Sequence, residues 1–193
     1  MRPRFVLASA SPRRRQLLSA AGYEFEIVSP HVEEVGHDWL TIRELTIWNA
    51  ARKAAVVSAI SPDAVVLAAD TLVTIDGEVL GKPADFEDAV EILRRLSGRV
   101  HEVWTAARIV DLGRRRSRSF HEMSRVHFRS LDDRAIRNYL AKIDPLDKAG
   151  AYAAQGDGQD IIQEIEGSYT NVVGLPMEKT RRALALFGVT PSK

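Results

Sequence analysis

Short apolar runs alternate along the chain with amphipathic stretches, and this alternation predicts strands and helices in turn. Residues 5–8 and 64–69 are apolar runs of the length of buried strands. Two further strands, 101–111 and 117–128, surround a polar tip at 113–116. Between the short runs 72–75 and 78–80, the dipeptide Asp76-Gly77 has the sequence of a type I′ hairpin turn.

Capping residues mark where the expected helices begin and end. Ser11 and Pro12 suit the N-cap and first position of a helix that stops at Gly22. Thr41 and Glu44 have the spacing of a capping box, which opens a helix to about residue 59. The other expected helices are one capped by Asp85 and ending near Leu96, one opened by Ser130 with Asp133, and one from Glu178 to Phe187.

Strands mixed with helices, some of the strands in hairpins, predict an α/β or α+β fold built on a mixed sheet. The segment 152–173 is expected to form strands and loops. We expect an elongated mixed sheet flanked by helices, with two lobes around a central cleft. The chain of 193 residues is expected to be a single domain, 1–193.

The composition excludes several classes of protein. Lys and Arg number 27 against 26 Asp and Glu, so the net charge of +1 gives no case for nucleic-acid binding. The absence of cysteine excludes disulfides, thiolate zinc sites and a cysteine nucleophile. No apolar run reaches the roughly 18–20 residues of a membrane span, and the start of the chain does not resemble a signal peptide. We therefore expect a cytoplasmic protein that binds no membrane.

A basic block coincides with the first expected helix start. Ser9 and Ser11 precede Arg13, Arg14 and Arg15. Cations at a helix N-terminus are mildly destabilising unless an anion is bound there, and phosphate is the usual anion. The alternative is a capped surface helix whose arginines are simply solvated.

Carboxylates supply the second candidate group. Asp70 directly follows an apolar strand, and open α/β sheets place their ligands at the carboxyl ends of strands. There it could hold a divalent metal or act as a base toward water. The alternative is a turn aspartate that accepts backbone hydrogen bonds. Glu33 and Glu34 offer further metal ligands, although an acidic pair in a loop is more often solvated.

Two lysines and one small-residue segment complete the candidates. Lys53 lies in an Ala-rich helix, where a solvated lysine is the simpler interpretation. Lys82 lies between a glycine and a proline, in a segment without Walker spacing. Tyr152 could pack against a base or belong to the core, and Gln155 could read polar edges of a ligand. Carboxylates, cations and hydroxyls together indicate metal-assisted phosphoryl chemistry.

In this order and spacing, these segments resemble the Maf family of nucleotide pyrophosphatases, from about Leu7 to Leu186. Each motif is weak by itself, and the combination is specific. The motifs are Leu7-Ala-Ser-Ala-Ser-Pro-Arg-Arg14, Glu33-Glu34, Lys53-Ala54, Ala69-Asp70-Thr71, Asp76-Gly-Glu-Val-Leu-Gly-Lys-Pro83, Leu96-Ser-Gly-Arg99 with His101, Asp147-Lys-Ala-Gly-Ala-Tyr152 with Gln155-Gly156, Gly167-Ser-Tyr169 and Val173-Gly-Leu-Pro176.

The resemblance implies hydrolysis of a nucleoside triphosphate to the monophosphate and pyrophosphate, on an inosine-triphosphatase-like fold. It implies a divalent metal cation, Mg²⁺ or Mn²⁺, as cofactor. Asp70 would be the catalytic residue that activates water, and Glu34 and Asp70 would bind the metal. The residues that would hold the triphosphate are Ser9, Arg13, Arg14, Lys53 and Lys82.

Substrate choice within the family rests on three positions, Arg13, Thr71 and Gln155. All three resemble the dTTP/UTP type of the family. At Gln155, an amide suits the neutral edge of uracil or thymine. Ala153-Ala154 depart from the usual Gly-Ile before Gln155, which could tune base preference. Three alternatives stay open: a 7-methyl-GTP pyrophosphatase, a purine-directed pyrophosphatase, and a regulator of cell division that binds nucleotide without turnover. The oligomeric state, including a homodimer, stays open as well.

Overall fold

The structure, a computed structural model, describes residues 2–32 and 39–192. The chain divides into two compact units, each assembled from separate stretches of sequence. Unit 1 comprises Met1–Asp70, Thr105–Glu122 and Gly174–Lys193, and unit 2 comprises Thr71–Trp104 and Met123–Val173.

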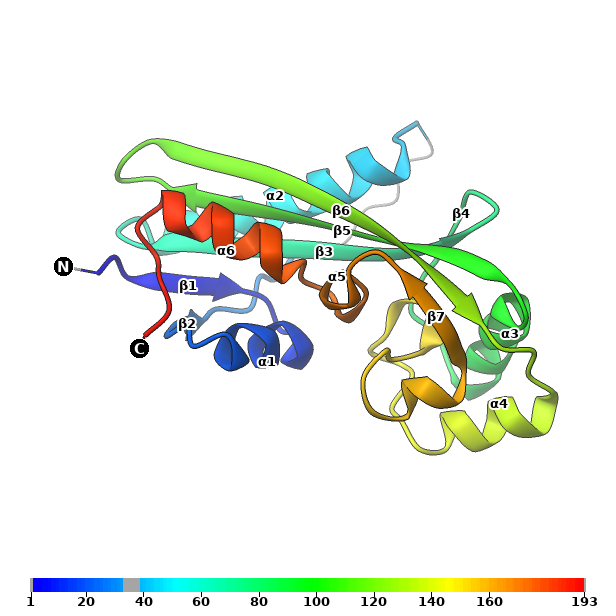
Figure 1. Cartoon of the computed structure of the whole chain (residues 1–193). Coiled ribbons are helices and arrows are strands. Elements are labelled where there is room, and N and C mark those ends of the chain that lie inside the picture. The colour runs from blue at the N-terminus through cyan, green and yellow to red at the C-terminus, as the bar shows by residue number, and fades with distance from the viewer. Residues whose placement is uncertain (1, 33–38, 193) are drawn as a thin grey trace. The chain divides into compact units, whose positions relative to one another are not determined.

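The strands of the described residues form one mixed sheet of seven strands. Its order is β2-β1-β3-β5-β6-β7, and β4 pairs with β3 (Figure 1). Pairs β1/β2 and β1/β3 are parallel, whereas β3/β4 and β6/β7 are antiparallel. The bounds are β1 Phe5–Ala8, β2 Glu26–Ile27, β3 Val65–Ile75, β4 Glu78–Leu80, β5 Val100–Asp111, β6 Arg116–Phe128 and β7 Ile162–Glu166.

The helices begin largely where the capping residues predict. Ser11 accepts a hydrogen bond from the backbone N–H of Arg14, and Thr41 and Glu44 form both bonds of a capping box. Asp85 caps its helix by accepting from the N–H of Asp88. The bounds are α1 Pro12–Ala20, α2 Ile42–Ile60, α3 Phe86–Leu96, α4 Asp133–Leu140, α5 Tyr169–Val173 and α6 Met177–Leu186.

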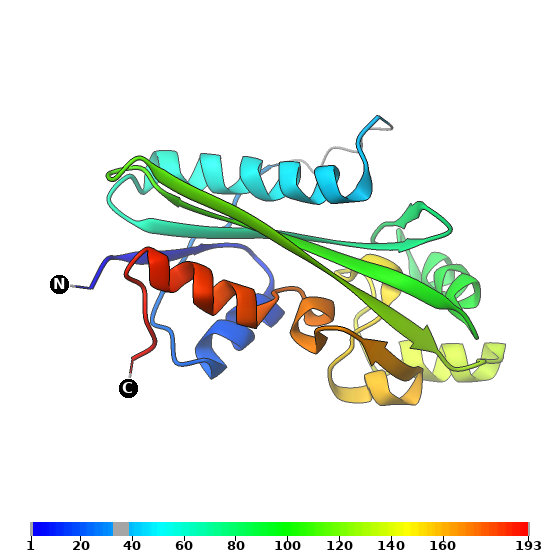
Figure 2. The same cartoon turned by 45° about the horizontal axis from the view of Figure 1, so that its top comes forward.

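In unit 1, alternate residues of β1 and β3 face different helices. The two strands run in register, with Ala8 opposite Ala68. One set of side chains, which includes Leu7 and Leu67, packs with α1 and α6, and the other set, which includes Ala8 and Ala68, packs with α2. Figure 2 shows α2 on one side of these strands and α1 and α6 on the other. Asp70 comes two positions after Ala68, so the alternation directs it toward α2.

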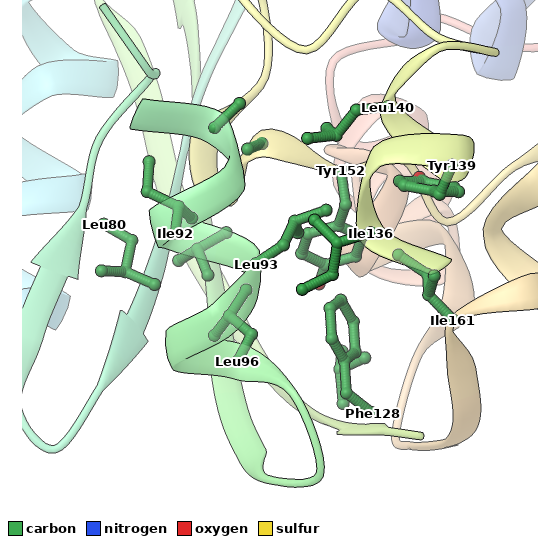
Figure 3. Packing of buried hydrophobic residues seen from close by; sticks show 14 of the residues in the cluster. Leu80, Ile92, Leu93, Leu96, Phe128, Ile136, Tyr139, Leu140, Tyr152 and Ile161 are labelled. Atoms are coloured by element: carbon green, nitrogen blue, oxygen red, sulfur yellow. The ribbon is translucent and has the colours of Figure 1, made fainter. Parts of the chain in front are cut away.

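Unit 2 has a separate apolar core. The amphipathic helices α3 and α4 pack together over it, and residues from β3 to β7 and from the segment after α4 complete it. Figure 3 shows this cluster from close by. Its labelled members are Leu80, Ile92, Leu93, Leu96, Phe128, Ile136, Tyr139, Leu140, Tyr152 and Ile161.

The strand expected to end at Asp70 instead continues to Ile75 as β3. Parallel pairing with β1 stops at Ala68, but the far end of β3 is paired with β4 through the hairpin. The hairpin itself is confirmed, because Asp76 and Gly77 have φ of 54° and 81°, as a type I′ turn requires. Asp70 is therefore held within a strand, and the predicted strand end was wrong.

Two further boundaries differ from the expectation. Asp132 rather than Ser130 caps α4, since its carboxylate accepts from the N–H of Ala135 at 2.7 Å. Part of the segment 152–173 forms the short helix α5, whose first turn is capped by the Ser168 hydroxyl accepting from the N–H of Asn171 at 3.2 Å. The strand expected in this segment is present as β7.

The α/β fold class and the mixed sheet are confirmed. The central cleft between two lobes stays a prediction. Within the described residues, no helix is both long and apolar enough to cross a membrane.

Candidate active site

Asp70 is buried beside two polar side chains of α2. The Lys53 ammonium donates to Asp70 Oδ1 at 2.6 Å, and the Asn49 amide Nδ2 donates to Asp70 Oδ2 at 3.3 Å. Asn49 and Lys53 lie one helical turn apart, so they share the face of α2 that meets β3. Asp70 itself is only 2% exposed.

The contacts with Lys53 and Asn49 compensate for the burial of the Asp70 carboxylate. Removing a charge from water costs several kcal/mol unless an opposite charge and hydrogen bonds compensate. Lys53 supplies the charge and Asn49 supplies a hydrogen bond to the second oxygen. Each carboxylate oxygen has two acceptor positions, so these two contacts leave capacity for the proton of a water molecule or for a metal ion. Because Asp70 lies within β3 and accepts from the side chains of Lys53 and Asn49, the interpretation of Asp70 as a turn residue is wrong.

The start of α1 forms a second polar cluster in unit 1. Ser9 Oγ accepts from the backbone N–H of Ser11 at 3.1 Å and from Arg14 Nη1 at 3.2 Å. Arg14 Nε donates to the carbonyl of Gly174 at 2.9 Å, which fixes the guanidinium. Within residues 2–32 and 39–192, these two donors occupy both acceptor positions of the Ser9 hydroxyl, so its hydrogen can donate to an anion. Arg13 is half-buried on the same turn.

These two clusters come from adjacent strands. Ser9 follows the last residue of β1, whose partner on β3 is Ala68. Parallel neighbours lie about 4.8 Å apart, so Ser9 leaves the sheet beside the part of β3 that carries Asp70. Four of the predicted site residues, Ser9, Arg14, Lys53 and Asp70, thus belong to one region of unit 1.

Three further predicted residues, Thr71, Lys82 and Gln155, lie in unit 2. Lys82 is exposed just after β4, and its loop contacts the turn Ala149–Ala151, where the Gly150 N–H donates to the carbonyl of Gly81 at 3.0 Å. Gln155 is half-buried and begins a turn in which its carbonyl accepts from the N–H of Gly158 at 3.3 Å. Thr71 follows Asp70 directly on β3. That Lys82 and Gln155 join the cluster around Asp70 stays a prediction.

The predicted metal ligands are described only in part, because Glu34 lies outside the described residues. Among the residues that are described, no group of three or more His, Cys, Asp or Glu side chains could hold a metal ion. Mg²⁺ usually needs only one or two carboxylates, since substrate phosphates and water complete its shell. Asp70, a hard oxygen donor with remaining acceptor capacity, fits such a site as one ligand.

Asn49 was not predicted as a site residue, although its position four residues before Lys53 on an expected helix was a usable signal. For Tyr152, both a base contact and a place in the core were possible from the sequence. The structure places Tyr152 in the core, against Phe128 and with its hydroxyl 2.8 Å from His101 Nε2. Burial lowers the pKa of His101 to about 3, with a smaller contribution from His127, so this ring is neutral.

Comparisons with known proteins identify the family of this chain. The family described as "Maf-like protein" matches residues 4–187. A "dTTP/UTP pyrophosphatase" of Pelotomaculum thermopropionicum is 46% identical over 183 residues, covering 95% of this chain and 96% of the relative. The protein of the same name from Carboxydothermus hydrogenoformans is 43% identical, covering 96% and 99%. Among solved structures, the Ham1 protein of Staphylococcus aureus matches with a TM-score of 0.47 and 15% identity, covering 65% of this chain and 71% of that one.

Proposed function

Because the chain belongs to the Maf-like protein family, we propose that it hydrolyses dTTP and UTP to the nucleoside monophosphate and pyrophosphate. The near full-length relatives named dTTP/UTP pyrophosphatase support the reaction and the substrate class. The observation that carries the chemistry is the buried Asp70 carboxylate, held by Lys53 and Asn49.

In the proposed reaction, Asp70 accepts a proton from the water that attacks the α-phosphorus. A bond forms between the water oxygen and this phosphorus as the bond to the bridging oxygen of the β-phosphate breaks. Pyrophosphate leaves with the electrons of that bond. General-base catalysis of this kind contributes about 10²–10⁴-fold in rate, and Lys53 and Asn49 keep the accepting oxygens in place.

The triphosphate is proposed to bind at the start of α1. The Ser9 hydroxyl donates to a phosphate oxygen, and Arg13 and Arg14 neutralise the negative charge that otherwise repels the attacking water. Lys53 is shared between Asp70 and a phosphate, and Lys82 supplies a further cation. Pre-oriented donors of this type act mainly by stabilising the charge of the transition state.

A divalent cation, Mg²⁺ or Mn²⁺, is proposed as cofactor, with Asp70 and Glu34 as its protein ligands. Bound there, it would neutralise phosphate charge and polarise the phosphoryl oxygens. Arg13, Thr71 and Gln155 are proposed to select the pyrimidine base. The cytoplasm as location and the absence of nucleic-acid binding remain predictions, and the oligomeric state stays open.

The test measures pyrophosphate release from dTTP, UTP, CTP, GTP and 7-methyl-GTP with Mg²⁺ or Mn²⁺, for the wild type and Asp70→Asn. Release from dTTP and UTP, reduced at least 100-fold in the variant, is expected. Preference for 7-methyl-GTP would overturn the substrate assignment and spare the reaction class. Tight binding of nucleotides without any turnover would instead make a nucleotide-binding regulator the better description.

A further inference from the structure

Three aromatic side chains from three elements hold the residues that lead to Gln155. Tyr139 of α4 donates its hydroxyl to the carbonyl of Ala153 at 3.3 Å and accepts from the N–H of the same residue at 3.0 Å. Tyr169 of α5 donates to the carbonyl of Ala154 at 3.3 Å. His101 of β5 contacts the hydroxyl of Tyr152 at 2.8 Å. All of these residues belong to unit 2.

The Tyr139 contact is specific because one hydroxyl satisfies both backbone groups of one residue. Tyr139 is 2% exposed, so its hydroxyl cannot rely on solvent. Burial raises the pKa of Tyr139 to about 12, which keeps the donating proton on the hydroxyl at neutral pH. With N–H and C=O bound to a fixed point, the peptide planes on both sides of Ala153 are oriented.

The turn after Gln155 closes against the same residue. A Cβ atom on Gly158 would lie 2.5 Å from the carbonyl oxygen of Ala153, so only glycine fits this approach. The N–H of Gly158 donates to the carbonyl of Gln155, and Gly156 has a φ of 63°. Gln155 is therefore the half-buried corner of a loop fixed on both sides.

Fixing this backbone has a direct use in recognition. A glutamine amide distinguishes bases by presenting its donor and its acceptor in a defined orientation. A mobile backbone would let the amide flip or tilt to suit several bases, and each ordered side chain costs free energy on binding. The two tyrosine hydroxyls remove part of that freedom before a ligand arrives.

We propose that Tyr139 and Tyr169 are positioning residues for Gln155, and that their hydroxyls set how strictly the protein selects a uracil or thymine base. The inference rests on the proposed function. It assigns a role to residues that would not touch the substrate and that act through the backbone of Ala153 and Ala154.

The chain has four tyrosines, and Tyr→Phe substitutions at three of them give a matched set of variants. Tyr139→Phe and Tyr169→Phe remove the hydroxyls and keep the rings. Tyr169 is 46% exposed, so its variant carries little risk to folding. Tyr23→Phe is the control, since Tyr23 packs in the separate core of unit 1. Gln155→Ala, alone and combined with Tyr139→Phe, tests whether the effect passes through Gln155.

The readout is kcat and KM for UTP and CTP. The ratio of kcat/KM for UTP to kcat/KM for CTP should fall about tenfold in Tyr139→Phe and about threefold in Tyr169→Phe. The change should come from the KM values, while kcat for UTP stays within about twofold of the wild type. Tyr23→Phe should keep the wild-type ratio. Adding Tyr139→Phe to Gln155→Ala should produce no further loss of discrimination.

Equal losses for both substrates, or fully additive effects with Gln155→Ala, would overturn the positioning role. An unchanged ratio in both tyrosine variants, with wild-type turnover of UTP, would overturn this inference and leave the proposed function standing. A wild-type protein that turns over neither UTP nor dTTP would overturn both.

Discussion

The two units bury ionisable side chains in opposite ways. In unit 1, Asp70 and Lys53 are buried as a charged pair, with Asn49 as an additional donor. In unit 2, His101 and Tyr152 are buried as a neutral pair among aromatic rings, because burial lowers the pKa of the histidine and raises that of the tyrosine. The first arrangement keeps a carboxylate charge in place, as the proposed proton transfer from water requires. The second keeps protons fixed, which suits orientation rather than chemistry.

The neutral pair also carries a cost that the charged pair avoids. Nδ1 of His101 is buried without a hydrogen-bond partner among the described residues. In either neutral tautomer, one ring nitrogen meets Tyr152 and the other is left unsatisfied, at about 1–3 kcal/mol. Edge-on packing of the ring against Phe128, at 4.8 Å between centroids, offsets part of this cost.

The largest expected effect is a difference in stability between variants of the Lys53–Asp70 pair and of the His101–Tyr152 pair. Lys53→Met leaves the Asp70 carboxylate buried without its counter-charge and should lower the free energy of unfolding by about 3–5 kcal/mol. Tyr152→Phe breaks the neutral pair and should cost about 1–2 kcal/mol. Urea denaturation measures both. Adding Asp70→Asn to Lys53→Met should recover part of the loss, and equal costs for the two single variants would contradict the comparison.

A second prediction concerns the pH dependence of stability that the neutral His101 causes. The folded pKa of His101 is about 3, below the unfolded value of about 6.5, so the unfolded state binds the proton first as pH falls. The stability contributed by the neutral ring is present above pH 6.5 and is lost between pH 6.5 and 3. Relative to His101→Gln, the wild type should lose about 2 kcal/mol between pH 7 and pH 5. Parallel pH–stability curves for the two proteins would rule out a depressed pKa.

A third prediction concerns Asn49, the hydrogen-bond donor to Asp70 that was not predicted from the sequence. Asn49→Leu removes the hydrogen bond to Asp70 Oδ2 and should lower kcat for UTP about tenfold. Asn49→Asp should lower it further, since a second carboxylate would repel Asp70. Val56→Ala, on the exposed face of the same helix, is the control. Full activity in Asn49→Leu would show that Lys53 alone orients the carboxylate.

The smallest expected effects come from helix caps. Thr41→Ala on α2 and Asp132→Ala on α4 should each cost about 1 kcal/mol of stability. Their functional consequences should differ. Thr41→Ala loosens the helix of Asn49 and Lys53 and should lower kcat, whereas Asp132→Ala loosens the helix of Tyr139 and should weaken UTP/CTP discrimination. Identical changes in kcat and in UTP/CTP discrimination for the two variants would contradict the separate roles proposed for the two units.

Local signals predicted much of the fold. The Thr41/Glu44 capping box, the Asp85 cap and the Asp76-Gly77 turn depend on neighbouring residues, and all three were confirmed. The predicted cap of α4 was wrong, because Asp132 rather than Ser130 caps that helix. The end of β3 was wrong because its continuation depends on pairing with β4 rather than on its own hydrophobic run. Helix α5 was missed because five residues give no helical periodicity.

For the candidate site too, the residue types could be predicted from the sequence, but the contacts between distant residues could not. The resemblance singled out Lys53 and Asp70, but only the alternation of β3 against α2 brings them within 2.6 Å. Tyr139 and Ala153 lie 14 positions apart, and no sequence pattern links a helix tyrosine to a distant backbone amide. Long-range contacts of this kind require the tertiary structure.

The place of Asp70 inside β3 has a consequence for how such a protein diversifies. A carboxylate anchored in a strand keeps its position when loops change, because the ladder of backbone bonds, rather than loop composition, holds it. The segment 153–158, by contrast, is a turn whose side chains can be exchanged while Gly158 keeps its shape. Under the proposed function, substitutions in that turn can change base preference while the proposed catalytic carboxylate keeps its position.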